Sequence, residues 1–200
     1  MGCGSSAPPP EAPNALASLK KKPSTKSYKL VILGDASVGK TSILNYLLNN
    51  TVAKSDYSPT IGFAFSSKLV KLESGEEVSL QLWDTWGQEE ARELVSVYYR
   101  DSHAALIVFD YSNVKSVEGV LYWLKKLEDK VNTKSMVIKI VGNKADLKGA
   151  EGGVRDEDLA RILEGTKDGG YERIDTSALT GLNVVSLFDK VAKECFERFR

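Results

Sequence analysis

Short apolar runs alternate with polar, glycine-containing segments from about residue 28 to the end of the chain. YKLVILG (28–34), AALIVFD (104–110) and MVIKIVG (136–142) are continuous apolar runs, which are typical of strands in a parallel sheet covered on both faces. FAFSSKLVKLE (63–73) and EVSLQLWD (77–84) are apolar-rich runs separated by a Ser-Gly turn signal. The runs 63–73 and 77–84 therefore predict a β-hairpin.

Between these runs, apolar residues return at the spacing of an amphipathic helix. One stripe holds Val117, Val120, Leu121, Leu124, Leu127 and Val131, and another holds Val184, Phe188, Val191, Cys195 and Phe199. Strands that alternate with helices predict an α/β fold with a doubly wound, mostly parallel sheet. We expect six strands, with one antiparallel edge strand supplied by the hairpin, and about five helices.

The first 26 residues differ from the rest of the chain. APPPEAP (7–13) is rich in proline, which disfavours helix and sheet, and a short basic run of lysines follows it. We therefore predict a disordered arm over residues 1–26 and one folded domain over residues 27–200.

Composition excludes several classes of function. Lys plus Arg and Asp plus Glu both number 27 in a chain of 200 residues, so nothing indicates electrostatic attraction to nucleic acid. No apolar run approaches the roughly 18 residues that a membrane helix needs. Two cysteines at opposite ends, Cys3 and Cys195, do not indicate a disulfide framework. No His/Cys cluster indicates zinc, and we interpret the one histidine, His103, as structural.

GDASVGKT (34–41) fits the phosphate-loop pattern G-x-x-x-x-G-K-[ST], between a predicted strand and the predicted helix SILNYLL (42–48). Its glycines permit a tight loop of inward N–H groups, and the helix adds its positive end. Lys40 would reach the outer phosphates, and the Thr41 hydroxyl would take a position on Mg²⁺. This predicts the P-loop NTPase fold. The predicted nucleotide-binding residues here are Gly34, Asp35, Ala36, Ser37, Val38, Gly39, Lys40, Thr41 and Ser42.

NKAD (143–146) points to guanine as the base. It follows a predicted strand, at the carboxyl edge of the sheet where ligands bind. The Asp146 carboxylate would accept hydrogen bonds from N1–H and the 2-amino group of guanine, a donor pair that adenine lacks. Such a site can discriminate by roughly 10⁴. Asn143 would brace the loop, and the stem of Lys144 would cover the ring face. From DTSAL (175–179) we add Ser177, Ala178, whose N–H would meet guanine O6, and Leu179.

In this order, GDASVGKT, WDTWGQ (83–88) and NKAD resemble the Ras-like small GTPases over about residues 27–200. The resemblance implies GTP or GDP as the ligand and Mg²⁺ as the cofactor. It implies that Thr60 closes over the metal and the γ-phosphate and that Asp84 holds the metal through water. It also implies that the Gly87 N–H senses the γ-phosphate and that Gln88 orients the attacking water. Lys40, Thr60 and Gln88 would form the catalytic set.

Within that family the chain is most similar to the Rab branch, because of IGFAF (61–65), the WDT before Trp86 and YYR (98–100). The likeness implies a monomeric switch in vesicle traffic, with an exchange factor, a GTPase-activating protein and effectors as partners. The implied effector surface contains Ile61, Phe65, Trp83 and Tyr98. Core packing is the alternative for its three aromatic residues.

Several positions depart from the family pattern. Trp86 stands where alanine is usual, Ala91 replaces an aromatic residue, and Leu179 replaces a lysine. The segment 41–60 is one residue longer, and Val52 is the nearest match to the aromatic residue that usually stacks on guanine. We therefore expect weaker nucleotide binding. The Trp86 indole either points away from the switch or crowds the γ-phosphate and slows hydrolysis.

MGCGSS (1–6) fits the myristoylation pattern M-G-x-x-x-[ST], with Gly2 as the acceptor. One myristoyl chain binds membranes weakly, and palmitate on Cys3 would supply the second anchor. We interpret Cys195 as a core residue and expect no prenylation. The arrangement resembles the N-myristoylated endosomal Rab proteins of plants and protists, which implies the cytoplasmic face of endosomes or of the plasma membrane.

Two other functions stay open. A GTP-locked or nucleotide-insensitive membrane scaffold would account for Trp86, Ala91 and Val52. A P-loop kinase of a small metabolite would use the same phosphate loop, although NKAD disfavours it.

Overall fold

The computed structural model describes residues 25–50, 64–85, 99–164 and 171–200. In these residues a six-stranded sheet has the order β2-β3-β1-β4-β5-β6. The strands are β1 (Lys26–Gly34), β2 (Ala64–Lys71), β3 (Glu77–Asp84), β4 (Ala104–Asp110), β5 (Val137–Asn143) and β6 (Glu172–Asp175). β2 is antiparallel to β3, and all other neighbours are parallel. The hairpin and the mixed sheet predicted from the sequence are confirmed.

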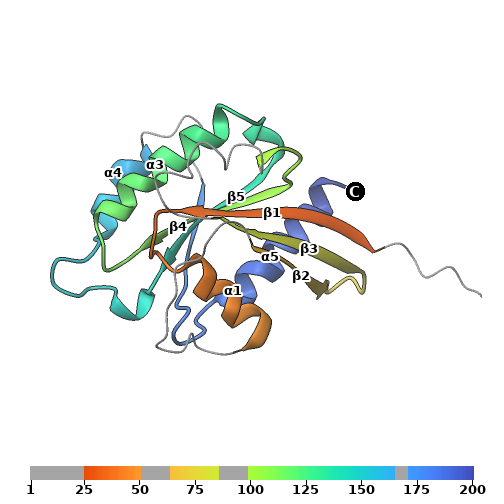
Figure 1. Ribbon diagram of the computed structural model, residues 1–200, viewed down its shortest axis with the longest axis horizontal. Helices are drawn as coiled ribbons and strands as arrows, with labels where there is room; N and C mark the ends of the chain where they lie inside the picture. Colours follow the sequence, from red (N-terminus) through yellow and green to blue (C-terminus); the bar gives the residue numbers. More distant parts are fainter. Residues whose placement is uncertain (1–24, 51–63, 86–98, 165–170) are drawn as a thin grey trace, which may run out of the picture.

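Helices cover both faces of this sheet (Figure 1). α1 (Lys40–Asn49) and α5 (Val184–Arg198) lie on one face, and α3 (Lys115–Glu128) and α4 (Asp156–Glu164) lie on the other. Two short 3-10 turns, η2 (Thr133–Ser135) and η3 (Ala145–Leu147), flank β5. This is the doubly wound α/β architecture of the P-loop NTPases, as predicted. None of the helices among the described residues is long and apolar enough to cross a bilayer.

The two faces hold separate apolar cores. β4 and β5 are buried at every position because helices pack on both of their sides. β3 instead alternates between buried and half-buried residues after the exposed Glu77. Cys195 is fully buried in the core beneath α1 and α5, so the prediction that it is a core residue is confirmed.

The predicted apolar stripe of α3 needs one correction. Leu121 is 37% exposed, whereas Trp123 is fully buried. At 100° per residue, the buried residues of α3 centre the stripe between Val120 and Leu127 and leave Leu121 at its margin. These buried residues are Ser116, Val117, Val120, Trp123, Leu124 and Leu127. Helical spacing alone did not reveal this rotation of the helix.

The parallel arrangement brings four chain segments to one edge of the sheet. Asp110 at the end of β4 pairs with Asn143 at the end of β5. Asp84 at the end of β3 pairs with Ile32 of β1, two residues before the phosphate loop begins at Gly34. Polar residues that are far apart in the sequence therefore meet beside the first turn of α1.

Candidate functional site

The phosphate loop joins β1 to α1 through backbone conformations with positive φ, which residues other than glycine rarely adopt. Ser37 has φ +62°, and Gly39, directly before the helix, has φ +95°. A Cβ atom on Gly39 would lie 2.3 Å from Nδ2 of Asn143. Glycine is therefore required here both for the dihedral angle and for the close approach of the loop after β5.

Lys40 is buried in this loop. Its Nζ donates hydrogen bonds to the main-chain carbonyls of Gly34 (2.8 Å) and Asp35 (2.7 Å). Burial lowers the pKa of Lys40 to about 8, against the opposing charges of Asp84 and Asp35. The ammonium is thus held inside the loop, and an anion bound there would favour its protonated form.

The side-chain carboxylate of Asp35 contacts α3. Its Oδ1 accepts a hydrogen bond of 3.0 Å from the indole N–H of Trp123 in α3. The side chain therefore fastens the loop to α3, whereas the main-chain carbonyl of Asp35 contacts Lys40. Ala36 and Ser37, at the tip of the loop, are exposed.

Thr41 and Asp84 form a pair at the phosphate end of the site. The Thr41 hydroxyl donates to Asp84 Oδ2 over 2.6 Å, and Asp84 is fully buried. Burial raises the pKa of Asp84, while the Thr41 hydroxyl and the Lys40 charge oppose the rise. Next to it, the Thr85 hydroxyl donates to the Ile32 carbonyl over 2.6 Å and fixes the end of β3 to β1.

This pair fits a magnesium site. Asp84 Oδ1 is buried and has no hydrogen-bond partner in the described part of the chain. A carboxylate and a hydroxyl are hard oxygen donors of the kind that Mg²⁺ prefers, together with substrate phosphates. Among the described residues no group of three or more His, Cys, Asp or Glu side chains is arranged to hold a metal ion.

A pocket of about 310 Å³ opens beside the loop. Residues from the phosphate loop, α1, the loop after β5 and the loop after β6 line it: Gly39, Ser42, Asn143, Lys144, Asp146, Leu147, Ala178 and Leu179. The predicted base-binding residues Asn143, Lys144, Asp146, Ala178 and Leu179 therefore lie around one cavity, next to Gly39 of the phosphate loop.

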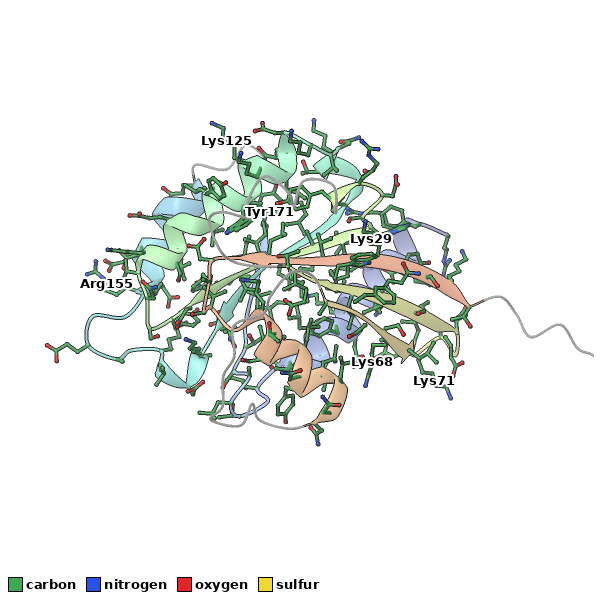
Figure 2. The ribbon with its side chains drawn as sticks, viewed as in Figure 1. Lys29, Lys68, Lys71, Lys125, Arg155 and Tyr171 are labelled. Carbon is green, nitrogen blue, oxygen red and sulfur yellow. The ribbon has the colours of Figure 1, made fainter. Side chains whose placement is uncertain are left out.

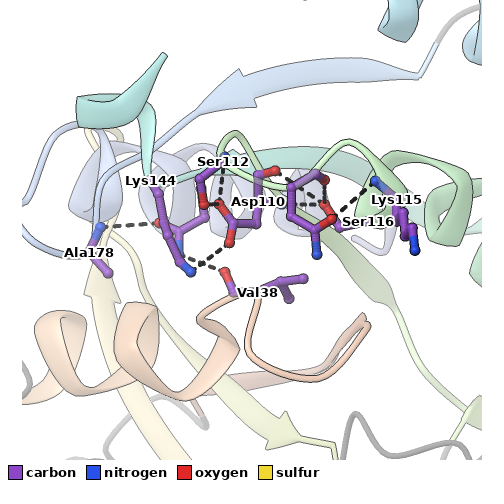
Figure 3. Close-up of polar contacts among 9 residues, drawn as sticks. Val38, Asp110, Ser112, Lys115, Ser116, Lys144 and Ala178 are labelled. Atoms are coloured by element: carbon purple, nitrogen blue, oxygen red, sulfur yellow. Dashed lines mark hydrogen bonds and ion pairs between the residues drawn. The ribbon is translucent and has the colours of Figure 1, made fainter. Parts of the chain in front are cut away.

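Asn143 links the walls of this pocket and is 1% exposed. Its Nδ2 donates to the Val38 carbonyl over 2.9 Å, and its Oδ1 accepts from the Ala178 N–H over 3.1 Å. The carbonyl of Thr176 accepts from the Ala145 N–H over 2.9 Å. One amide thus ties the loop after β5 to both neighbouring loops (Figure 3).

Asp146 is held by a hydrogen bond from the Ser177 hydroxyl to its Oδ1. The same hydroxyl accepts the Thr180 N–H over 3.1 Å, so the carboxylate is oriented by the neighbouring loop. Leu179 is 59% exposed at the rim. The pocket therefore combines an exposed carboxylate on one side with an apolar wall on another.

Comparison with known proteins decides the family. The profile of the Ras family matches residues 29–197. The chain belongs to the Ras family. Members of this family are GTPases, which are hydrolases, and they generally bind GTP or GDP and Mg²⁺.

Rab proteins are among the similar relatives of this Ras-family GTPase. It is 37% identical over 174 residues to the Ras-related protein Rab-26 of Drosophila melanogaster, an alignment that covers 87% of this chain and 44% of that protein. It is 33% identical over 181 residues to Rab-5B of Plasmodium falciparum, covering 90% and 84% of the two chains. It is 38% identical over 169 residues to RABA2a of Arabidopsis thaliana, covering 84% and 75%. Rab homologues are in general membrane-associated.

Part of the expected effector surface lies in the described residues. Phe65 is 57% exposed and meets the half-buried Trp83 edge-to-face, with ring centroids 5.2 Å apart. Lys29 is labelled in Figure 2. Its ammonium lies 5.0 Å from the centre of the Trp83 ring and donates to the Arg100 carbonyl over 2.8 Å. Phe65 is thus not a core residue, which leaves it accessible to a partner.

Other predictions fall on residues outside the described ranges. Among them are the switch residues Thr60, Ile61, Gly87, Gln88 and Tyr98, the departures Val52, Trp86 and Ala91, and the acylation residues Gly2 and Cys3.

Two residues outside the predicted set also hold the site together. Asp110 contacts Lys144 (2.6 Å), and the Thr176 hydroxyl donates to Asn143 Oδ1 (3.4 Å). The signal for Asp110 was present, because it ends the apolar run 104–110 at the same edge of the sheet as Asn143. No motif marks Thr176 beyond its place before Ser177.

Proposed function

We propose that this Ras-family GTPase is a Rab-type switch in membrane traffic, which binds effectors when loaded with GTP and hydrolyses GTP slowly. The observation that carries the proposal is the contact between the two halves of the site. Asn143 of the base-binding loop donates to Val38 of the phosphate loop, so one ligand with a base and a phosphate chain would bridge both.

Guanine selectivity would come from Asp146. Its carboxylate lines the pocket and is oriented by Ser177, and it can accept from N1–H and the 2-amino group of guanine. Adenine would leave it unpaired, which can discriminate by roughly 10⁴. The Ala178 N–H already donates to Asn143, and we expect it to lie beside guanine O6 in the bound state.

The Thr41–Asp84 pair and the residues near it would bind the phosphates and the metal. Lys40 would neutralise the outer phosphates, Thr41 with Thr60 would hold Mg²⁺, and Asp84 would hold it through water. The metal would supply charge neutralisation on the phosphate oxygens. The Gly87 N–H would sense the γ-phosphate, and Gln88 would orient the attacking water. Intrinsic hydrolysis by Ras-type proteins is on the order of 10⁻⁴ s⁻¹ and is accelerated by a partner's arginine.

We further propose that the protein reaches the cytoplasmic face of endosomes or of the plasma membrane by myristate on Gly2 and palmitate on Cys3. Two chains are needed because a single myristoyl group binds weakly. In cells fed an alkyne analogue of myristate, we expect labelling that Gly2→Ala abolishes. Cys3→Ser should retain the label but release the protein from membranes.

The nucleotide proposal is tested by ligand selectivity and turnover. Fluorescent GDP should bind and be displaced by GTP, while ATP should compete at least a thousandfold less well. Single-turnover phosphate release should require Mg²⁺, and Gln88→Leu should slow it without preventing GTP binding. Equal competition by ATP would overturn the assignment and favour a metabolite kinase.

Trp86 motivates a second candidate, a long-lived GTP state that acts as a membrane scaffold. An indole next to Gly87 would crowd the γ-phosphate if it faced the ligand, and a displacement of about 1 Å can slow catalysis around a hundredfold. Phosphate release should be compared between the natural protein and Trp86→Ala. A clear rise without the indole would support the scaffold, whereas equal rates would support the ordinary switch.

A further inference from the structure

The last residue of β4 carries a buried carboxylate that does not line the nucleotide pocket. Asp110 is 5% exposed, and it sits opposite Asn143 in the register of β4 and β5. The phosphate loop, the Thr41–Asp84 pair and the base pocket all have assigned roles without it. A buried carboxylate at the ligand-binding edge of an α/β sheet still requires a physical reason.

Asp110 is fixed by the loop that leads into α3. Its Oδ1 accepts the Ser112 N–H over 2.8 Å and the Ser112 hydroxyl over 2.7 Å. Its main-chain N–H donates to the Ser116 hydroxyl over 2.9 Å. These bonds set the orientation of the carboxylate before any contact with the base-binding loop is made (Figure 3).

The second oxygen of this carboxylate holds Lys144. Asp110 Oδ2 accepts from Lys144 Nζ over 2.6 Å, and the Lys144 side chain is 36% exposed while that of Asp110 is 7% exposed. Lys144 itself has φ +59° and directly precedes η3. Its side chain therefore leaves a strained main-chain position and has its ammonium bound at the end of β4.

This pair is better suited to positioning than to general stability. A buried ion pair is weak evidence for a stabilising role, because the cost of removing the charges from water offsets much of their attraction. Lys144 also lines the pocket between Asn143 and Asp146. With both ends of the side chain held, its aliphatic stem is kept along the pocket wall, where it can cover the face of a bound base.

We propose that Asp110 is a positioning residue that acts through Lys144 to slow the release of guanine nucleotide. It would touch neither the base nor the phosphates. Without its Oδ2, the Lys144 ammonium would turn to water and the stem would leave the pocket wall. The nucleotide would then be bound by Asp146 and the phosphate loop alone and would dissociate faster.

The inference rests on the proposed guanine pocket, and a double-mutant cycle tests it in the full-length protein with Mg²⁺. Dissociation of fluorescent GDP is chased with excess GDP in the natural protein, Asp110→Ala, Lys144→Met and the double variant. We expect each single change to raise the dissociation rate about tenfold, which is the worth of one hydrogen bond between charged groups. The double variant should be no faster than the faster single one.

Lys148→Met is the matched control. Lys148 lies on the same loop and pairs with Asp175 (3.1 Å) and Asp156 (3.3 Å), but it does not line the pocket. This variant should release GDP at the natural rate. If Asp110→Ala does not fold, Asp110→Asn replaces it, because the amide oxygen can still accept from Ser112 while the charge that holds Lys144 is gone.

The outcomes separate the two proposals. A natural protein that binds no guanine nucleotide would overturn the proposed function. A natural protein that binds GDP, with unchanged release in Asp110→Ala and Asp110→Asn, would overturn the positioning role alone. The positioning role would also be overturned if the rate changes of Asp110→Ala and Lys144→Met multiplied in the double variant. Asp110 would then act independently of Lys144.

Discussion

The side-chain amide of Asn143 donates a 2.9 Å hydrogen bond to the main-chain carbonyl of Val38. The two residues lie 105 positions apart, one at the end of β5 and the other in the phosphate loop. Asn143 is buried, so the bond is shielded from water and its loss would leave a buried carbonyl unpaired. The base-binding and phosphate-binding halves of the site are therefore joined directly by a buried hydrogen bond.

Asn143→Asp is expected to separate these halves. The substitution keeps the shape of the side chain but places an acceptor against the Val38 carbonyl. We expect a loss of about 2–4 kcal/mol in the free energy of unfolding, as for a buried hydrogen bond replaced by a repulsive charge. Urea unfolding of the nucleotide-free protein would measure it, and GDP release should be faster.

Asn183→Asp is the control for this change. Asn183 also donates to a main-chain carbonyl, that of Asp175, over 2.9 Å, but it is exposed. Because water can replace an exposed bond, the control should lose at most about 1 kcal/mol. Similar losses in the two variants would contradict the view that burial makes the Asn143 bond important.

Gly39→Ala should destabilise the protein more than the same change at Gly75. Both glycines have nearly the same φ, +95° and +94°, so backbone strain of about 1–2 kcal/mol is common to both. A Cβ on Gly39 would lie 2.3 Å from Asn143 Nδ2, whereas nothing lies within 4 Å of one on Gly75. The difference between the two unfolding free energies measures the contact with Asn143, and equal losses would count against it.

The sequence predicted those parts of the site that lie in short motifs. Lys40 and Asn143 each follow an apolar strand run, and carboxyl ends of parallel strands meet at one edge of a sheet, so their proximity could be inferred. The hairpin of β2 and β3 followed from its turn signal in the same way.

Contacts that depend on how helices sit on the sheet could not be inferred. Asp35 was expected to serve the nucleotide through the inward N–H groups of its loop, and no motif indicates that its carboxylate binds Trp123 of α3. That contact depends on the rotation of α3, which also buries Trp123 and exposes Leu121. The Asp110–Lys144 pair likewise depends on the path of one side chain, which no residue spacing encodes.

We expect Lys40 to take up a proton when nucleotide binds above pH 7. Burial lowers the pKa of Lys40 to about 8 in the protein without ligand, and bound phosphates would raise it again. The protonated form binds, so affinity should fall as the pH rises through 8, by about fourfold between pH 7 and pH 8.5. Calorimetry of GDP binding at pH 8.5, in buffers with different ionisation enthalpies, would measure the uptake.

Lys40→Arg provides the comparison for that experiment. A guanidinium stays protonated over the whole range, so this variant should bind GDP, even if more weakly, without proton uptake. Uptake of the same size in both proteins would place the titrating group elsewhere and contradict the role assigned to Lys40.

Leu179→Lys should tighten nucleotide binding. Leu179 lines the pocket and is 59% exposed, so a lysine there can lay its stem along the rim and bring its ammonium to the base and the phosphates. A cation near an aromatic face contributes ~0.5–1 kcal/mol at an exposed site, which predicts GDP release about two- to fivefold slower.

Leu182→Lys is the matched control, since Leu182 is 49% exposed but does not line the pocket. Stopped-flow chases at low and high salt would separate a local contact from a general effect of charge, because only the general effect is largely screened by salt. If both variants slow release equally at low salt and neither does at high salt, the apolar wall at Leu179 is not what limits affinity.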